Sequence, residues 1–242
     1  MLVAAAVCPS APLLVPEVAA GAAFELDTLR AACADAIGVL AASRPDRLVV
    51  IGPAEHPGRG RHHEGARGSF REFGVDLDVR LGSGPAPAAS AEDTGADRPL
   101  PPSLAVAAWL LRGWAAAPLE GLGVGESLEQ DRCAATGAMI ATTADRVALL
   151  VMGDGSACRT LKAPGYLDER AEPFDASVGA ALAAADTGAL AALDTELAQE
   201  LQAAGRATWQ VLAGAAQGAG LAGQLLHEDA PYGVGYFVAT WT

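Results

Sequence analysis

The sequence contains little positive charge. Sixteen of its 242 residues are Lys or Arg, against 29 Asp and Glu, so the net charge at pH 7 is −13. A chain with this charge repels phosphate backbones and anionic lipid surfaces, and it lacks the basic stripe that nucleic-acid binding needs. It also has no stretch of the ~18 to 20 uninterrupted apolar residues that a membrane span needs. We therefore expect neither a nucleic-acid partner nor a membrane partner.

Cysteine is scarce, and its spacing excludes the common cysteine-rich sites. The four cysteines form no C-x-x-C pair and lie far apart, at Cys8, Cys33, Cys133 and Cys158. They are expected to be reduced, buried thiols of a cytoplasmic protein, although the polar neighbours of Cys158 leave its reactivity open. No Lys or Arg precedes the apolar N-terminus, and three prolines interrupt it. Both features argue against a secretory signal peptide.

Two sequence motifs of common enzymes are also absent. No G-x-G-x-x-G phosphate loop follows a predicted strand. Ser156 lies in Gly-Asp-Gly-Ser-Ala-Cys rather than in the G-x-S-x-G turn of many serine hydrolases. Hydrolysis through Ser156, with His56 as the base, is a hypothesis that requires the two side chains to lie within roughly 3 Å of each other.

The sequence has many apolar segments, some typical of buried strands and others with apolar residues at helical spacing. Leu2–Val7, Arg47–Gly52 and the run "RVALLVM" are typical of buried strands, and Phe24–Ala42 has apolar residues at helical spacing. A strand, a helix and a second buried strand predict a parallel sheet. We expect one α/β domain over residues 1–242, with a mostly parallel central sheet flanked by helices. The segments 57–68 and 82–103 are predicted to be flexible loops, followed by a helix over 103–117 that Ser103 caps. Another helix is predicted over 187–204.

Polar residues follow three of the predicted strands. Ligands in open parallel sheets bind outside the carboxyl ends of the strands, so these residues are expected to line one cleft. The candidate residues are Ser10, Glu55, His56, Asp154, Ser156 and Arg159. Arg159 and nearby Lys162 favour an anionic ligand such as a carboxylate. A Gly-supported turn around Asp154 and Ser156 is the structural alternative.

Four stretches carry a resemblance to a known family. In chain order they are "CPSAPLLVPEV", "VVIGPAEH", "VMGDGSACR" and "HEDAPYGVGYFVA". They resemble motifs of the class III extradiol ring-cleavage dioxygenase superfamily, which includes the catalytic B subunits and Memo-like proteins. The resemblance implies the B-subunit fold. It also implies an Fe(II) site of two histidines and one glutamate, a further acid/base histidine, and an aromatic substrate.

The resemblance also implies which functional residues this chain lacks. Ser10 and Ala54 stand where the two iron-binding histidines are expected, and Ala157 stands in place of the acid/base histidine. No glutamate occurs in Ala203–Ala207, where the third ligand is expected. We therefore expect a protein without cofactor that has lost the Fe(II) site. It would keep a cleft for a small anionic or aromatic ligand, or serve as a subunit of a homodimer or larger assembly.

An active enzyme is the alternative. An Fe(II)-dependent dioxygenase or related oxidoreductase would need relocated ligands, and Glu55, His56 and Asp154 are the candidates. One loop supplies two of these three side chains. Transition-metal sites usually have three or four protein ligands.

Overall fold

The central element of the structure, a computed structural model, is a mixed β-sheet. The structure describes residues 1–84 and 98–242. Within them, seven strands form one sheet in the order β3-β6-β2-β7-β1-β9-β8. The inner strands β6, β2, β7 and β1 are parallel, while β3, β9 and β8 are antiparallel to their neighbours. The strands are β1 (Leu2–Cys8), β2 (Arg47–Pro53), β3 (Gly60–His62), β6 (Leu119–Val124), β7 (Val147–Met152), β8 (Gly223–Asp229) and β9 (Tyr236–Trp241).

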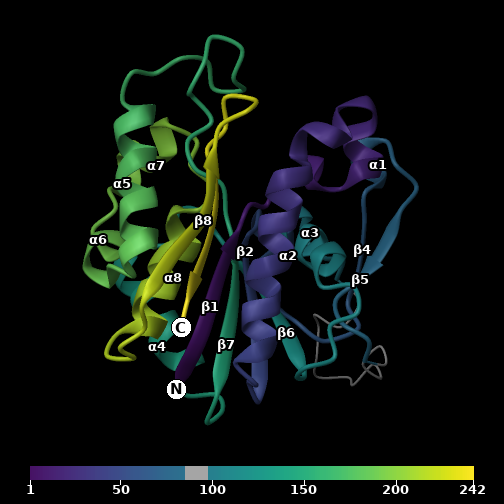
Figure 1. The fold of residues 1–242 in the computed structure, drawn as a ribbon, viewed down its shortest axis with the longest axis vertical. Coiled ribbons are helices and arrows are strands. Elements are labelled where there is room, and N and C mark those ends of the chain that lie inside the picture. Colours follow the sequence, from purple (N-terminus) through teal and green to yellow (C-terminus); the bar gives the residue numbers. More distant parts are fainter. Residues whose placement is uncertain (85–97) are drawn as a thin grey trace.

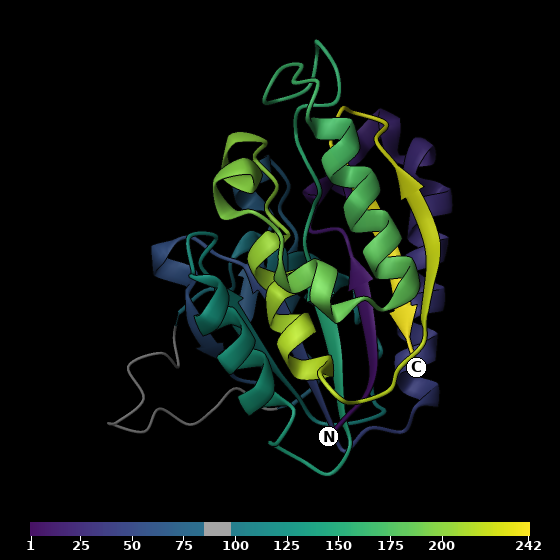
Figure 2. The same ribbon diagram turned by 90° about the vertical axis from the view of Figure 1, so that its left-hand side faces the viewer.

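Helices cover both faces of the sheet (Figure 1). On one side lie α1 (Pro16–Ala19), α2 (Asp27–Ala42) and α3 (Pro102–Leu110). On the other lie α4 (Gln130–Ile140), α5 (Ala171–Ala184), α6 (Thr187–Ala191), α7 (Thr195–Glu200) and α8 (Arg206–Ala216), and Figure 2 looks onto this layer. Short 3-10 helices are η1 (Pro12–Leu14), η2 (Ala20–Leu26), η3 (His56–Gly58) and η4 (Arg71–Phe73). The predicted single α/β domain with a mostly parallel sheet is confirmed.

The strands alternate their side chains between two apolar cores. In β7, Leu149 and Val151 belong to the core beneath α8, whereas Leu150 and Met152 belong to the core beneath α2. All six residues of β7 are buried, as expected of a central parallel strand with helices on both faces. This packing fixes the inner strands, and it places their carboxyl ends side by side at one edge of the sheet.

The structure differs from the sequence prediction in three helical details. The single helix predicted over 187–204 is two helices, α6 and α7, because the Asp194 carboxylate accepts the Leu197 N–H at 2.8 Å and starts a new helix. The helix predicted over 103–117 spans Pro102–Leu110 instead. Ser103 does not cap it, since its hydroxyl donates to the Pro53 carbonyl at 2.7 Å.

Strand structure also occurs outside the predicted segments. β8 was not predicted, and its register shifts between Leu225 and His227. The segment 57–68, predicted to be a loop, contains β3 and the start of β4 (Arg67–Ser69), which pairs with β5 (Asp78–Arg80). β3 forms because Gly60 and His62 pair with Gly123 and Gly121 of β6. Of the predicted loop 82–103, residues 85–97 lie outside the described residues.

The contact between α4 and α8 requires glycine. A methyl group on Gly137 would overlap the Val211 carbonyl oxygen, and one on Gly214 would overlap the Ala134 carbonyl. We expect Gly137→Ala to lower the free energy of unfolding by about 1–3 kcal/mol, because backbone atoms must move apart. Equilibrium denaturation in urea measures the change.

Gly38→Ala is the matched control for this prediction. Gly38 lies inside α2, and a methyl group there meets no atom within 4 Å. The better helix propensity of alanine should raise the stability by up to about 1 kcal/mol. Equal gains in both variants would contradict the proposed close approach of α4 and α8.

Candidate functional site

A cavity of about 740 Å³ opens at the carboxyl ends of the parallel strands. Ser10 follows β1, Glu55 follows β2, Glu126 follows β6 and Asp154 follows β7, so the four inner strands each deliver one polar residue to it. The polar lining consists of Ser10, Glu55, Arg59, Ser69, Glu72, Ser103, Glu126 and Asp154. The apolar lining comprises Ala54, Gly58, Leu100 and the prolines Pro12, Pro53, Pro57, Pro99, Pro101 and Pro102.

Asp154 and Ser10 join the ends of β7 and β1. The Ser10 N–H donates to Asp154 Oδ1 at 2.8 Å, and the Ser10 hydroxyl donates to Oδ2 at 3.0 Å. Burial raises the pKa of Asp154 from 3.8 to about 6, although hydrogen bonds from Ser10 and Ala11 favour the carboxylate. The hydrogen bonds from Ser10 therefore fix in the cavity a carboxyl group whose pKa lies at about 6.

Glu126 and Arg206 were missed by the sequence reasoning. Arg206 is buried, and its guanidinium donates to the Leu128 carbonyl at 2.7 Å, to Gln210 Oε1 at 2.9 Å and to the Glu126 carbonyl. These bonds hold the loop after β6, which carries the Glu126 side chain. Burial and the nearby Glu55 carboxylate raise the pKa of Glu126. Glu126 follows an inner strand, so the rule that nominated the other three junctions could have found it.

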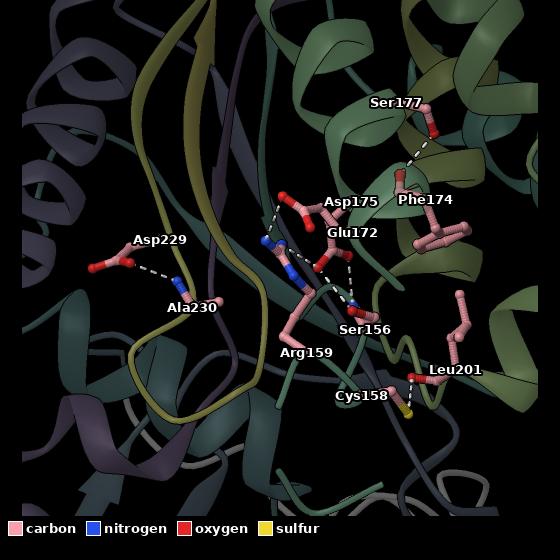
Figure 3. Close-up of polar contacts among 10 residues, drawn as sticks. All are labelled: Ser156, Cys158, Arg159, Glu172, Phe174, Asp175, Ser177, Leu201, Asp229 and Ala230. Carbon is pink, nitrogen blue, oxygen red and sulfur yellow. Dashed lines mark hydrogen bonds and ion pairs between the residues drawn. The ribbon is translucent and has the colours of Figure 1, made fainter. Parts of the chain in front are cut away.

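Ser156 and Arg159 belong to a separate polar cluster (Figure 3). Asp175 of α5 accepts the Ser156 N–H at 2.8 Å and the Ser156 hydroxyl at 2.7 Å. Arg159 donates to the same carboxylate at 3.1 Å, and it lies 3.8 Å from Glu172. Ser156 and Asp175 are each 0% exposed. Burial raises the pKa of Asp175, and the donors from Ser156 and Arg159 oppose that effect.

This second cluster corrects the predicted cleft. The two residues contact α5 and do not line the cavity. The turn after β7 bonds to the chain before β9, since the Gly155 N–H donates to Gly235 and the Gly235 N–H donates to Ser156. This pairing directs Ser156 toward Asp175. The cation expected to attract an anionic ligand is therefore engaged by a buried carboxylate.

His56 and Cys158 do not line the cavity. His56 is exposed at the start of η3, although its neighbour Glu55 lines the cavity. The Ser156 hydroxyl donates to Asp175 rather than to an imidazole, so the Ser156–His56 pair that hydrolysis requires is not formed. Cys158 is 1% exposed, and its thiol lies 3.5 Å from the Gly165 and Leu201 carbonyls. Burial raises the pKa of Cys158, which opposes formation of a reactive thiolate.

Within residues 1–84 and 98–242, no three His, Cys, Asp or Glu side chains form a group that could hold a metal ion. The relocated ligand set Glu55, His56 and Asp154 is thus not assembled. None of the helices in those same ranges is long and apolar enough to cross a membrane.

Comparisons with known proteins identify a fold likeness. No family model matches the chain, and no curated protein matches it. Among solved structures, the crystal structure of uncharacterized protein JW3007 from Escherichia coli K12 is similar, with a TM-score of 0.50 and 16% sequence identity. The alignment covers 99% of this chain and 99% of that one. At this identity the likeness shows that the two chains share an α/β fold over their whole lengths.

Proposed function

We propose that this protein is a divergent member of the class III extradiol dioxygenase superfamily, in which a small-molecule-binding cleft has replaced the Fe(II) site. One observation carries the proposal. Ser10 and Ala54, which stand at the positions of the two expected histidines, line the same cavity as Asp154. The stretch expected to carry the glutamate lies beside them, because the Gly205 N–H donates to the Asp154 carbonyl at 2.8 Å.

The residues at those positions do not fit Fe(II). A serine hydroxyl and an alanine methyl stand where two imidazoles are expected. The stretch Ala203–Ala207, where the glutamate is expected, contains the cation Arg206 and no carboxylate. Ser10 is already engaged with Asp154. Iron in oxygenases of this kind needs a facial set of two histidines and one carboxylate, with open positions for substrate and O₂. Binding of a small organic molecule, rather than ring cleavage, is the function that this cavity supports.

Metal analysis tests the loss of the iron site. Protein purified without chelator, with and without added Fe(II) under anaerobic conditions, should contain far less than one equivalent of iron, zinc or manganese. His56→Ala and Glu55→Gln should leave that residual content unchanged. Stoichiometric metal that either variant removes would contradict the proposal and support the relocated-ligand enzyme.

Ligand binding tests the cleft itself. A fragment library screened by ligand-observed NMR should contain binders that Glu55→Trp displaces, because the indole would obstruct the cavity from an exposed position. His56→Trp is the matched control, since His56 is exposed and adjacent but does not line the cavity. Binding that is insensitive to Glu55→Trp would place the ligand elsewhere. Assembly with a second copy or a partner chain stays a prediction.

A further inference from the structure

The charges that line the cavity are strongly unbalanced. Among the described residues, the lining contains four carboxyl groups, those of Glu55, Glu72, Glu126 and Asp154, and one guanidinium, that of Arg59; Arg206 lies behind Glu126, outside the lining. Arg59 donates from Nε to the Ala54 carbonyl at 3.3 Å. Within the described ranges 1–84 and 98–242, none of the four carboxyl groups forms an ion pair with Lys, Arg or His.

Two partly or fully buried carboxylates elsewhere in the chain, Asp175 and Glu120, do form ion pairs. Asp175 pairs with Arg159, and Glu120 pairs with Arg47 and Arg61. In the cavity, burial and the Glu55 carboxylate raise the pKa of Glu126, against the opposing charges of Arg206 and Arg59. A positive charge placed between Glu55 and Glu126 would relieve the repulsion. The concave walls amplify this preference, because they exclude part of the water that would otherwise screen it.

The arrangement suits an organic cation better than a metal ion. Ca²⁺ and Mg²⁺ need about six or more oxygen ligands within roughly 2.6 Å. The carboxyl groups come instead from separate strand ends, and no three of the described side chains form a metal-binding group. Leu100 and the prolines supply apolar walls for a hydrocarbon part. The volume lies in the ~300–1,000 Å³ range of small-molecule pockets.

We propose that the cavity binds a small organic cation, an amine or guanidinium compound with an apolar body, whose charge lies between Glu55, Glu126 and Asp154. The inference rests on the proposed function, because it names the ligand class of the same cleft. It replaces the anionic ligand that the sequence suggested, since Arg159 lies outside the cavity and pairs with Asp175.

Three probes of similar size and different charge test the inference. Benzylamine, benzyl alcohol and benzoate are titrated at pH 7.5 into the full chain, and binding is measured by NMR chemical-shift changes. Benzylamine should bind at least about tenfold more tightly than benzyl alcohol, and benzoate should bind most weakly. The preference should fall to about twofold in Glu55→Gln/Glu126→Gln, and 0.5 M salt should weaken it.

Controls separate the ligand class from the cleft. Glu129→Gln removes an exposed charge close in sequence to Glu126 but outside the cavity, and should preserve the preference. Alcohol or benzoate binding as tightly as the amine, with Glu55→Trp displacing it, would overturn the cationic ligand and keep the cleft. If no probe binds up to millimolar concentration in a manner sensitive to Glu55→Trp, both proposals fail.

Discussion

Asp175→Ala is expected to lower the free energy of unfolding by about 3–5 kcal/mol. The substitution removes the acceptor for the Ser156 N–H, the Ser156 hydroxyl and the Arg159 guanidinium at once. Ser156 is fully buried, so its donors would have no water to replace the carboxylate. Arg159, whose side chain is 24% exposed, would keep part of its hydration. Urea denaturation at pH 7, followed by circular dichroism, measures the loss.

Glu172→Gln and Asp175→Asn are the comparison variants for Asp175→Ala. Glu172→Gln removes the other carboxylate near Arg159, but that side chain is 81% exposed and lies 3.8 Å away, so the stability should change by less than about 0.5 kcal/mol. Asp175→Asn keeps one acceptor oxygen and should lose less than Asp175→Ala. A change below about 1 kcal/mol in Asp175→Ala would mean that the turn after β7 does not depend on this ion pair.

Asp154→Asn is expected to change how stability depends on pH. The folded protein holds the Asp154 proton up to a pKa of about 6, whereas the usual value is 3.8. Below pH 3.8 both states are protonated, and this carboxyl costs nothing. As the pH rises from 3.8 through 6, the unfolded chain ionises first, so the wild type loses roughly 3 kcal/mol that asparagine does not lose. The stability of the variant relative to wild type should rise by that amount between pH 3.5 and pH 7.

The difference in stability between Asp154→Asn and wild type, followed over pH, isolates the contribution of the Asp154 carboxyl group. Any constant difference in the hydrogen bonds of asparagine affects all pH values alike, so only the change with pH is diagnostic. Ser10→Ala removes one hydrogen bond that favours the carboxylate. In that variant the pKa of Asp154 in the folded protein should be higher, so stability should continue to fall up to a higher pH than in the wild type. If the free energy of unfolding changes with pH in the same way in wild type and Asp154→Asn, then Asp154 has the same pKa in the folded and unfolded chain, and the prediction is wrong.

The central sheet could be predicted because its strands are continuous apolar runs. β1, β2 and β7 lie where those runs predict, since a strand with helices on both faces needs apolar residues on both. β8 escaped prediction because it is only partly buried and its register shifts within the strand. The break between α6 and α7 escaped as well. The leucine spacing continues across it, and only the bond from Leu197 to Asp194 shows where the second helix begins.

The candidate site was predictable in part for a topological reason. Ser10, Glu55 and Asp154 follow parallel strands, so their meeting in one cavity follows from strand direction alone. Ser156 lies only two residues beyond Asp154, yet it faces α5. Its placement depends on Asp175, 19 residues away, and on a turn that bonds to Gly235. No local pattern in the sequence encodes contacts of that range.

The outer edge strand β8 limits how copies of this protein can associate. An exposed edge offers unpaired backbone groups to a neighbouring chain, and natural proteins block such addition with charges and irregular strands. β8 has both devices, because Glu228 and Asp229 are exposed and the pairing shifts before His227. Strand-to-strand joining of two sheets along β8 is therefore disfavoured.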